Sequence, residues 1–415
     1  MKLRNTAVLE TIFTMMGHFA QGNAPAKKFW SGIEVAPFKD NADAAICITA
    51  DFELSWGWRA GGQETLEFKG KSARRNVPLI LALLDEYSIP ITWATVGHLF
   101  LESCTRSSSG LAHANMPRPL SDGSWTGDWY SDDPCSNVRK DPLWYGPDLI
   151  QQIMECSTSH EIGTHSFSHI NFSARYSSPD VVRRELESCV DAMQPFGLRP
   201  KSLVFPRNRS EYSYLPLLAN AGIVAVRHRD RDGGIRLSHP ERTPAGVYKI
   251  YESMNLRDAR HYDYLQKAKV FIQKAMQRHA VYSLWFHPSD PTEVFDTHFR
   301  GILRYIDSER KAGRLWVATM GDLAAYCEAR EQLQLSPERI GNTLTLTFRS
   351  SLDTSRYGTP ELSLLIPASY EPRSVWLELI DGERKPVDVG FVSGNGSPRL
   401  IVNVPTTAKT LQLTL

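Results

Sequence analysis

Short apolar runs alternate with longer amphipathic segments between residues 44 and 330. This alternation is typical of parallel strands joined by helical crossovers. The expected strands are Ala45–Ala50, Ile91–Val96, Glu161–His165, Ser202–Phe205, Ile223–Arg227, Val281–Phe286 and Leu315–Thr319. The expected helices, whose apolar residues recur at helical spacing, are Val77–Tyr87, Val181–Met193, Tyr262–Arg278 and Phe295–Ala312. This order of elements predicts an α/β protein whose parallel strands form a barrel.

After residue 330 the pattern changes to short β-prone runs separated by Gly, Pro, Asn and Asp turns. The expected strands are Leu344–Arg349, Glu361–Ile366, Val375–Ile380, Val387–Val392, Leu400–Val404 and Thr410–Leu415. They predict a small all-β sandwich that is joined to the barrel near Ser336 and Pro337. The expected organisation is a helical extension over residues 1–43, a barrel over 44–333 and a β-sandwich over 338–415.

The N-terminal segment has a basic start and small residues near position 23, which are features of an export signal. Glu10 and His18 interrupt the apolar stretch that such a signal needs, so we expect a helix there instead. The chain has no run of about 18 apolar residues, the minimum for a membrane-spanning helix. We therefore expect no membrane span and a cytoplasmic protein.

Charge and cysteine usage exclude several classes of function. The 415 residues include 47 Lys+Arg and 46 Asp+Glu, a formal charge of +1, which argues against a nucleic-acid-binding protein or one that coats anionic membranes. Six cysteines occur without a C-x-x-C pair, which argues against a zinc finger or a dithiol redox motif. They are expected to be free thiols in a reducing compartment.

Two carboxylates follow the first expected strand. Asp51 and Glu53 are two residues apart on extended backbone, so both point to the same side. In a parallel barrel the C-terminal ends of the strands face the active site. Alone, this pair is a weak signal that is better explained as two solvated carboxylates.

A histidine pair follows the third expected strand, in HEIGTHSFSH. A spacing of four residues brings His165 and His169 within reach of one metal ion if the segment is helical. Further along, His287 ends the run SLWFH, and Arg207 follows the strand in LVFPRNR. Each could be structural by itself. Their coincidence at the same end of four strands is what predicts a functional site.

One carboxylate and two histidines form the three-ligand set of an open divalent-metal site. Such an ion acidifies a bound water and polarises a carbonyl group. A second carboxylate can take the water's proton, and a separate histidine can protonate a leaving amine. The residues together predict a hydrolase of amide bonds.

In this order, the motifs ITADFE, HEIGTHSFSH, FPRNR and LWFHP resemble those of the polysaccharide deacetylase superfamily, over residues 44–328. The resemblance implies a distorted (β/α) barrel and a metal-dependent amidase or esterase of carbohydrates. It places Asp51 on the catalytic base, and Arg207 near the arginine that contacts this base. It places Glu53, His165 and His169 on the metal ligands, and His287 on the general acid.

Three departures from the family pattern bear on these assignments. The usual adjacent Asp-Asp is here Asp-Phe-Glu, which leaves open whether Asp51 or Glu53 binds the metal. The arginine motif is Pro-Arg-Asn, where Arg-x-Pro-Tyr is common. The Asp-and-Trp motif that orients the general acid is not recognisable, and Arg227, Asp230 or Asp232 in VRHRDRD are its candidate substitutes.

A long irregular segment, residues 104–147, is rich in aromatic and acidic residues. Loops of this length are more often functional than idle connections. The segment could form a substrate lid, with a candidate sugar-binding set of Trp129, Tyr130, Trp144 and Tyr145. The same rings could instead pin the loop to the barrel, an equally good explanation.

The sequence thus predicts a hydrolase that removes an N-acyl group, an N-acetyl group in the first instance, from an amino sugar, a glycan or a glycolipid precursor. Zinc is the expected ion, with cobalt, nickel or manganese as alternatives. Two other hypotheses are hydrolysis of another C–N bond, such as a formamide or a cyclic imide, and a catalytically inactive glycan-binding protein. The β-sandwich is expected to serve structure or oligomerisation, which would allow a homodimer.

Overall fold

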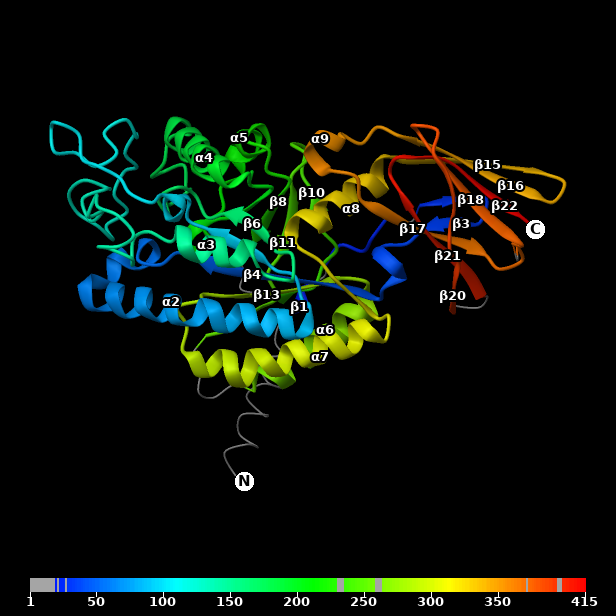
Figure 1. The fold of residues 1–415 in the computed structure, drawn as a ribbon, viewed down its shortest axis with the longest axis horizontal. Helices are drawn as coiled ribbons and strands as arrows, with labels where there is room; N and C mark the ends of the chain where they lie inside the picture. Colours follow the sequence, from blue (N-terminus) through cyan, green and yellow to red (C-terminus); the bar gives the residue numbers. More distant parts are fainter. Residues whose placement is uncertain are drawn as a thin grey trace, which may run out of the picture.

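A curled, mostly parallel sheet is the centre of the larger domain in the computed structural model, which describes residues 19–20, 22–26, 28–229, 235–257, 263–370, 372–393 and 398–415. Its strand order is β10-β11-β8-β7-β6-β5-β4-β13-β12, with β14 paired to β4. Every strand expected for the barrel is present: β4 (Ala44–Phe52), β5 (Thr92–Thr95), β6 (Glu161–Thr164), β7 (Ser202–Val204), β8 (Ala225–His228), β13 (Val281–Phe286) and β14 (Leu315–Val317). The prediction of an α/β barrel is therefore confirmed (Figure 1).

Between β8 and β13, the sheet is continued by a segment that the sequence analysis did not predict. Within residues 248–255, β11 (Tyr248–Tyr251) pairs in parallel with β8, and β12 (Met254–Asn255) pairs in parallel with β13. Between them, the Ser253 backbone N–H donates to the carbonyl of Ser283 at 2.8 Å. The sequence analysis missed this segment because Glu252 and Ser253 interrupt its apolar run. The two strands on either side of the interruption are very short. β10 (Glu241–Arg242) adds an antiparallel edge to β11.

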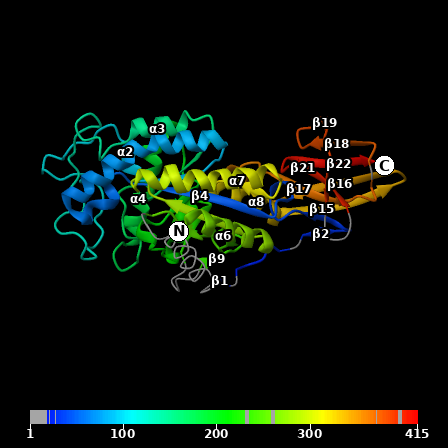
Figure 2. The ribbon, with the colours of Figure 1, turned by 90° about the horizontal axis from the view of Figure 1, so that it is seen from below.

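Helices cover the outside of the barrel (Figures 1 and 2). They are α2 (Gly62–Tyr87), α3 (Pro147–Met154), α4 (Pro179–Met193), α5 (Leu215–Asn220), α6 (Tyr264–Arg278), α7 (Arg300–Lys311) and α8 (Met320–Gln332). Helix α2 begins well before the expected Val77, because its first turns are polar and carry little amphipathic signal. Strand β4, which is overlaid by helices and has strands on both sides, is buried along its whole length.

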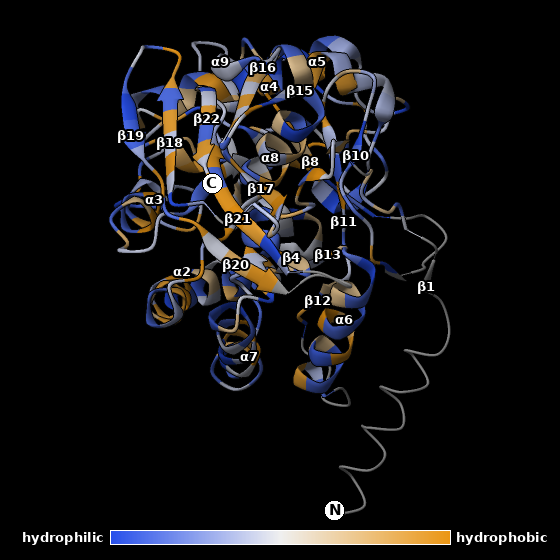
Figure 3. Ribbon diagram, turned by 90° about the vertical axis from the view of Figure 1, so that its right-hand side faces the viewer, coloured by the Kyte–Doolittle hydropathy of each residue, from blue (hydrophilic) through white to orange (hydrophobic). Residues whose placement is uncertain are grey.

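Two antiparallel sheets form the smaller domain, in the orders β15-β16-β22-β18-β19 and β2-β3-β17-β21-β20. Their strands are β2 (Phe29–Trp30), β3 (Ile33–Val35), β15 (Leu333–Ile340), β16 (Thr343–Ser350), β17 (Glu361–Pro367), β18 (Ser374–Leu379), β19 (Arg384–Pro386), β20 (Gly390–Ser393), β21 (Pro398–Pro405) and β22 (Ala408–Thr414). Buried and less buried positions alternate along β16, β21 and β22, so each sheet turns one apolar face to the other. Figure 3 views the molecule from the side of these sheets.

The boundaries between the parts differ from those expected. Ser336 and Pro337 lie inside β15, which follows α8 directly, so they are not a linker. Residues 29–35 form β2 and β3, and β3 pairs with β17 of the sandwich. The apolar side chains of Ile33 and Val35 alternate along β3 and are buried there. Within the described part of 19–43 the only helical turn is Lys39–Asn41, and the helix expected over residues 1–18 lies outside the described residues.

The described residues contain no helix that combines the length and the hydropathy needed to cross a bilayer.

Candidate active site

The two carboxylates at the end of β4 have different partners. Glu53 lies with the histidine pair: one side-chain donor atom each from Glu53, His165 and His169 lie within 4.8 Å of one another. Asp51 is instead held by Arg227. Both carboxylates are buried, with exposed fractions of 4% and 6%. The side chains thus share one side of the strand, as the spacing predicts, but they are set up for different tasks.

The histidine pair is brought together by a turn and not by a helix. β6 ends at Thr164, and Ser166 and His169 have φ angles of +60° and +61° in the left-handed region. In this turn, His165 Nε2 and His169 Nε2 each lie 3.1 Å from Glu53 Oε1. Strained, non-glycine residues of this kind are typical of functional sites.

The tautomer of His165 and the burial of its neighbours suit metal binding. His165 Nδ1 lies 2.8 Å from the carbonyl oxygen of Val204, which can only accept, so Nδ1 carries the hydrogen and Nε2 is free toward Glu53. Burial lowers the pKa of His169 to about 4. Burial alone would raise the pKa of Glu53, but His169 and His287 hold it well below its usual value. Two imidazoles beside a carboxylate are a zinc-type donor set.

Asp51 and Arg227 form a buried, two-pronged ion pair, with Nη1–Oδ1 and Nη2–Oδ2 distances of 2.6 Å each. Arg227 also donates to Thr49 Oγ1 at 2.8 Å and lies over the ring of Trp285, 4.5 Å from its centroid. Burial would raise the pKa of Asp51, but Arg227 lowers it below its ordinary value. Asp51 is therefore held as a carboxylate.

Arg207, which was expected beside Asp51, lies elsewhere. Its guanidinium donates to Asp122 Oδ2 at 2.6 Å and to Ser124 Oγ at 3.0 Å. Arg207 follows β7, whereas Arg227 lies on β8, where the side chain points inward to the end of β4. Asp230 and Asp232, the other candidates in this stretch, lie outside the described residues.

His287 follows the end of β13 at the open side of this group. Its Nε2 lies 3.8 Å from Glu53 Oε1, and donor atoms of Asp51, Glu53 and His287 lie within 4.8 Å of one another. The His287 backbone N–H donates to Asp290 Oδ2 at 3.0 Å, and that same oxygen lies 3.8 Å from His287 Nδ1. Asp290, which the sequence analysis missed, is therefore the group that faces the far side of the imidazole.

A cavity of about 600 Å³ opens over Asp51, Glu53 and His287. Its wall includes aromatic and cationic side chains that the sequence analysis did not single out: Trp58, Phe68, Lys69, Arg229, Arg257 and Trp285. Arg207 also lines it, at the rim. Trp58 lies only a few residues after Glu53, in the stretch ELSWGW, and this aromatic cluster next to a candidate ligand was a usable signal.

The four aromatic residues proposed from the long segment do not line this cavity. They are buried, with exposed fractions between 0 and 8%: Trp129, Tyr130, Trp144 and Tyr145. Their packing in the core of the barrel is the arrangement described above as pinning the loop. Trp129 lines a separate small pocket of about 20 Å³.

Two of these rings support the histidine turn from behind. Trp129 Nε1 donates to Ser168 Oγ at 2.8 Å, and Tyr130 Oη donates to Glu185 Oε1 at 3.0 Å. Ser168, which precedes His169, in turn donates its N–H and its hydroxyl to the two oxygens of Glu185. The long segment therefore positions the site without contacting its cavity.

Gly57 allows the Glu53 carboxylate to occupy its place. A Cβ atom at residue 57 would lie 1.8 Å from Glu53 Oε2, so Gly57→Ala must displace this carboxylate. Because a misplacement of about 1 Å costs on the order of 10²-fold in rate, we expect a loss of that size in kcat/KM with little change in Tm. Steady-state kinetics and thermal unfolding check this, with Gly62→Ala as a control, where only the backbone conformation resists the change. A Gly57→Ala protein with full activity would contradict the placement of Glu53.

Comparison with known proteins gives a family match for part of the sequence and similar folds among solved structures. Residues 67–226 match the family model described as polysaccharide deacetylase. This range includes His165, His169 and Arg207 but excludes Asp51, Glu53 and His287. No curated protein matches the sequence.

Among solved structures, the chain is similar to a polysaccharide deacetylase structure from Mycobacterium smegmatis, with a TM-score of 0.52, 15% identity, and coverage of 77% of this chain and 99% of that one. It also matches a polysaccharide deacetylase structure from Pseudomonas aeruginosa PAO1, with a TM-score of 0.47, 14% identity, and coverage of 70% and 92%. A match to Puue allantoinase has a TM-score of 0.46, 15% identity, and coverage of 70% and 92%. The first of these supports the barrel fold.

Proposed function

Because the chain belongs to the polysaccharide deacetylase superfamily through the domain matched at residues 67–226, we propose that it is a metal-dependent hydrolase of C–N bonds. Its proposed substrate is an N-acylated, in the first instance N-acetylated, amino sugar within a glycan or a glycolipid precursor. The observation that carries this proposal is the convergence of Glu53, His165 and His169 beside the buried Asp51–Arg227 pair.

The donor set fits a divalent transition metal. Two imidazoles and one carboxylate suit zinc, and also cobalt, nickel or manganese, better than magnesium or calcium. The carbonyl of Val204 fixes the tautomer of His165, as metal-bound histidines require. When bound there, such an ion would acidify a water molecule and polarise the carbonyl group of the scissile amide.

The neighbouring residues supply the proton transfers. Asp51, held ionised by Arg227, accepts a proton from the attacking water at one of its carboxylate oxygens. His287 Nε2, on the cavity side, donates a proton to the leaving amine. Asp290 faces Nδ1 of the same ring and orients it for this step.

The cavity wall supports a sugar as the substrate. Trp58 and the exposed ring of Phe68 offer apolar faces on which a sugar ring can stack. Lys69 and Asp290 offer polar groups for its hydroxyls.

The test measures metal content and turnover together. We expect purified wild-type protein to release acetate from N-acetylated amino-sugar oligomers, and His165→Ala/His169→Ala to lose both this activity and the metal bound at Glu53. Formate release or imide ring opening, with no acetate release, would change the proposed substrate class but would still support hydrolysis of a C–N bond. A wild-type protein that binds glycans and stays inactive after zinc or cobalt is added would contradict the enzymatic proposal.

A further inference from the structure

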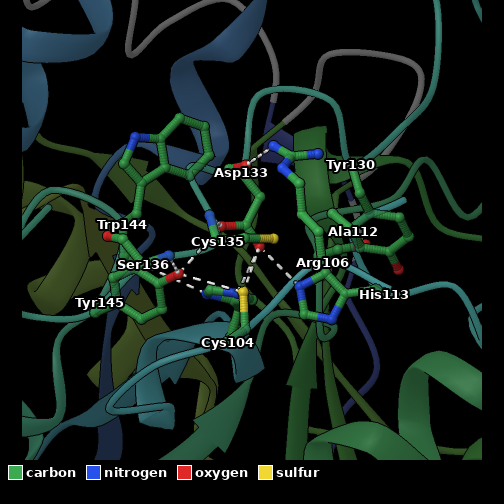
Figure 4. Close-up of polar contacts among 12 residues, drawn as sticks. Cys104, Arg106, Ala112, His113, Tyr130, Asp133, Cys135, Ser136, Trp144 and Tyr145 are labelled. Atoms are coloured by element: carbon green, nitrogen blue, oxygen red, sulfur yellow. Dashed lines mark hydrogen bonds and ion pairs between the residues drawn. The ribbon is translucent and has the colours of Figure 1, made fainter. Parts of the chain in front are cut away.

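A second group of metal-binding side chains lies away from the candidate active site. One donor atom each from His98, Cys104, His113 and Asp133 lie within 4.8 Å of one another. His98 belongs to the short 3-10 helix Gly97–Phe100 after β5, whereas the other three residues lie in the long irregular segment. Figure 4 shows Cys104, His113 and Asp133 directed toward one another.

One carboxylate oxygen is the centre of this group. Asp133 Oδ2 lies 2.7 Å from His113 Nε2, 2.9 Å from His98 Nε2 and 3.3 Å from Cys104 Sγ. The other oxygen, Oδ1, accepts from the Cys135 backbone N–H at 2.9 Å and from Tyr145 Oη at 3.2 Å. The carboxylate is therefore oriented by its Oδ1 partners, and Oδ2 faces the two imidazoles and the thiol.

The orientation of His98 is that of a metal ligand. Its Nδ1 lies 3.2 Å from the carbonyl oxygen of Trp144, which can only accept, so Nδ1 carries the hydrogen of the neutral ring. Its Nε2 is fully buried and lies 2.9 Å from Asp133 Oδ2, but the two atoms do not meet the geometry of a hydrogen bond. A buried Nε2 without a well-formed hydrogen bond, next to a carboxylate, a second imidazole and a thiol, is placed as a metal ligand would be.

We propose that His98, Cys104, His113 and Asp133 bind a second metal ion, a structural zinc, that fastens the long segment to the barrel. Two imidazoles, one thiolate and one carboxylate are all established zinc ligands. The thiolate and the carboxylate carry two negative charges, which a divalent ion neutralises in this buried place. Zinc bond lengths of about 2.0–2.3 Å put tetrahedral ligands roughly 3.3–3.8 Å apart, so the distances from Asp133 Oδ2 to the other three donor atoms need to lengthen by about 1 Å at most.

The number of protein ligands indicates that the proposed zinc ion is structural and not catalytic. Four protein ligands fill a tetrahedral zinc site and leave no position for water or substrate, which is the arrangement of structural sites. This site shares no residue with the Glu53 group, so the inference does not depend on the proposed function. The alternative is a hydrogen-bonded hub in which His113 and Cys104 donate to Asp133 with no ion bound.

Metal analysis of purified protein separates these cases. We expect two metal ions per wild-type chain, one in Cys104→Ser or His113→Ala, and one in His165→Ala/His169→Ala. Cys156→Ser, which changes another partly buried free thiol, should keep both ions. Wild-type protein whose metal content is unchanged by Cys104→Ser and His113→Ala would overturn the second site, whatever the outcome at the first.

A spectroscopic measurement on wild-type protein avoids dependence on a variant that fails to fold. The Glu53 group has no cysteine, so cobalt bound there gives no thiolate-to-metal charge-transfer band. We expect cobalt-substituted wild-type protein to show this band in the near ultraviolet, and chelation to remove it and increase proteolysis within residues 104–147. Full cobalt loading without the band would overturn the proposal.

Discussion

Asp51→Asn should lower kcat by about 10²–10⁴-fold, the range expected for the loss of a general base, and leave metal binding at Glu53 intact. The amide cannot accept a proton from water, but it is nearly the same size as the carboxylate. The measurement is deacetylation kinetics on protein whose metal content has been determined. The carboxylate of Asp51 bonds to Arg227 and not to the histidines, so removal of its charge should spare the metal ligands.

Glu53→Gln is the matched control for this prediction. Its Oε1 is the atom that both His165 Nε2 and His169 Nε2 approach at 3.1 Å, so the substitution should weaken metal binding. If Asp51→Asn lost the metal and Glu53→Gln retained it, the roles of the two carboxylates would be exchanged.

Arg227→Met should destabilise the protein by about 3–5 kcal/mol at neutral pH, because it leaves the buried carboxylate of Asp51 without its partner. Arg227 lowers the pKa of Asp51 in the folded state, so the stabilisation from this pair is present above the unfolded-state pKa and is lost as pH falls through the folded-state value. The difference between wild type and variant should therefore shrink in acid. Urea unfolding at neutral and acidic pH measures it.

The same substitution should move the acidic limb of the pH–rate profile to higher pH, because the pKa of Asp51 rises when Arg227 is removed. Arg227→Lys keeps a charge but loses the two-pronged contact and should show a smaller shift. Arg207→Met should not move this limb, since Arg207 pairs with Asp122. A shift in Arg207→Met, but none in Arg227→Met, would reverse the two assignments.

The barrel strands could be predicted because they are buried on both faces, which gives continuous apolar runs such as Ala44–Phe52. Elements with weaker signals were missed. β11 and β12 are too short and too polar at their junction, and β15 contains a proline, Pro337, that is unusual in a strand. β3 was missed because it is only three residues long and lies in a range that was expected to be helical.

The candidate site was predictable to the extent that its residues follow strands directly. Asp51, His165 and His287 are each placed by the end of a strand, so position along the chain indicated position in space. Whether Arg207 or Arg227 pairs with Asp51 depends on which side chain points into the barrel. An arginine-rich stretch of sequence does not reveal this direction. The His98 group was invisible because its members are spread from residue 98 to residue 133 with no short spacing.

The pairing of β3 with β17 joins the start of the chain to its last part. During synthesis, the whole barrel sequence is made before the partner of β3. The sheet that contains β3 can therefore form only after β17 and β21 have been synthesised. A chimeric protein that takes the sandwich residues after 333 from a relative would also need the relative's segment equivalent to residues 29–35. Without that segment, β17 would become an exposed edge and a template for aggregation.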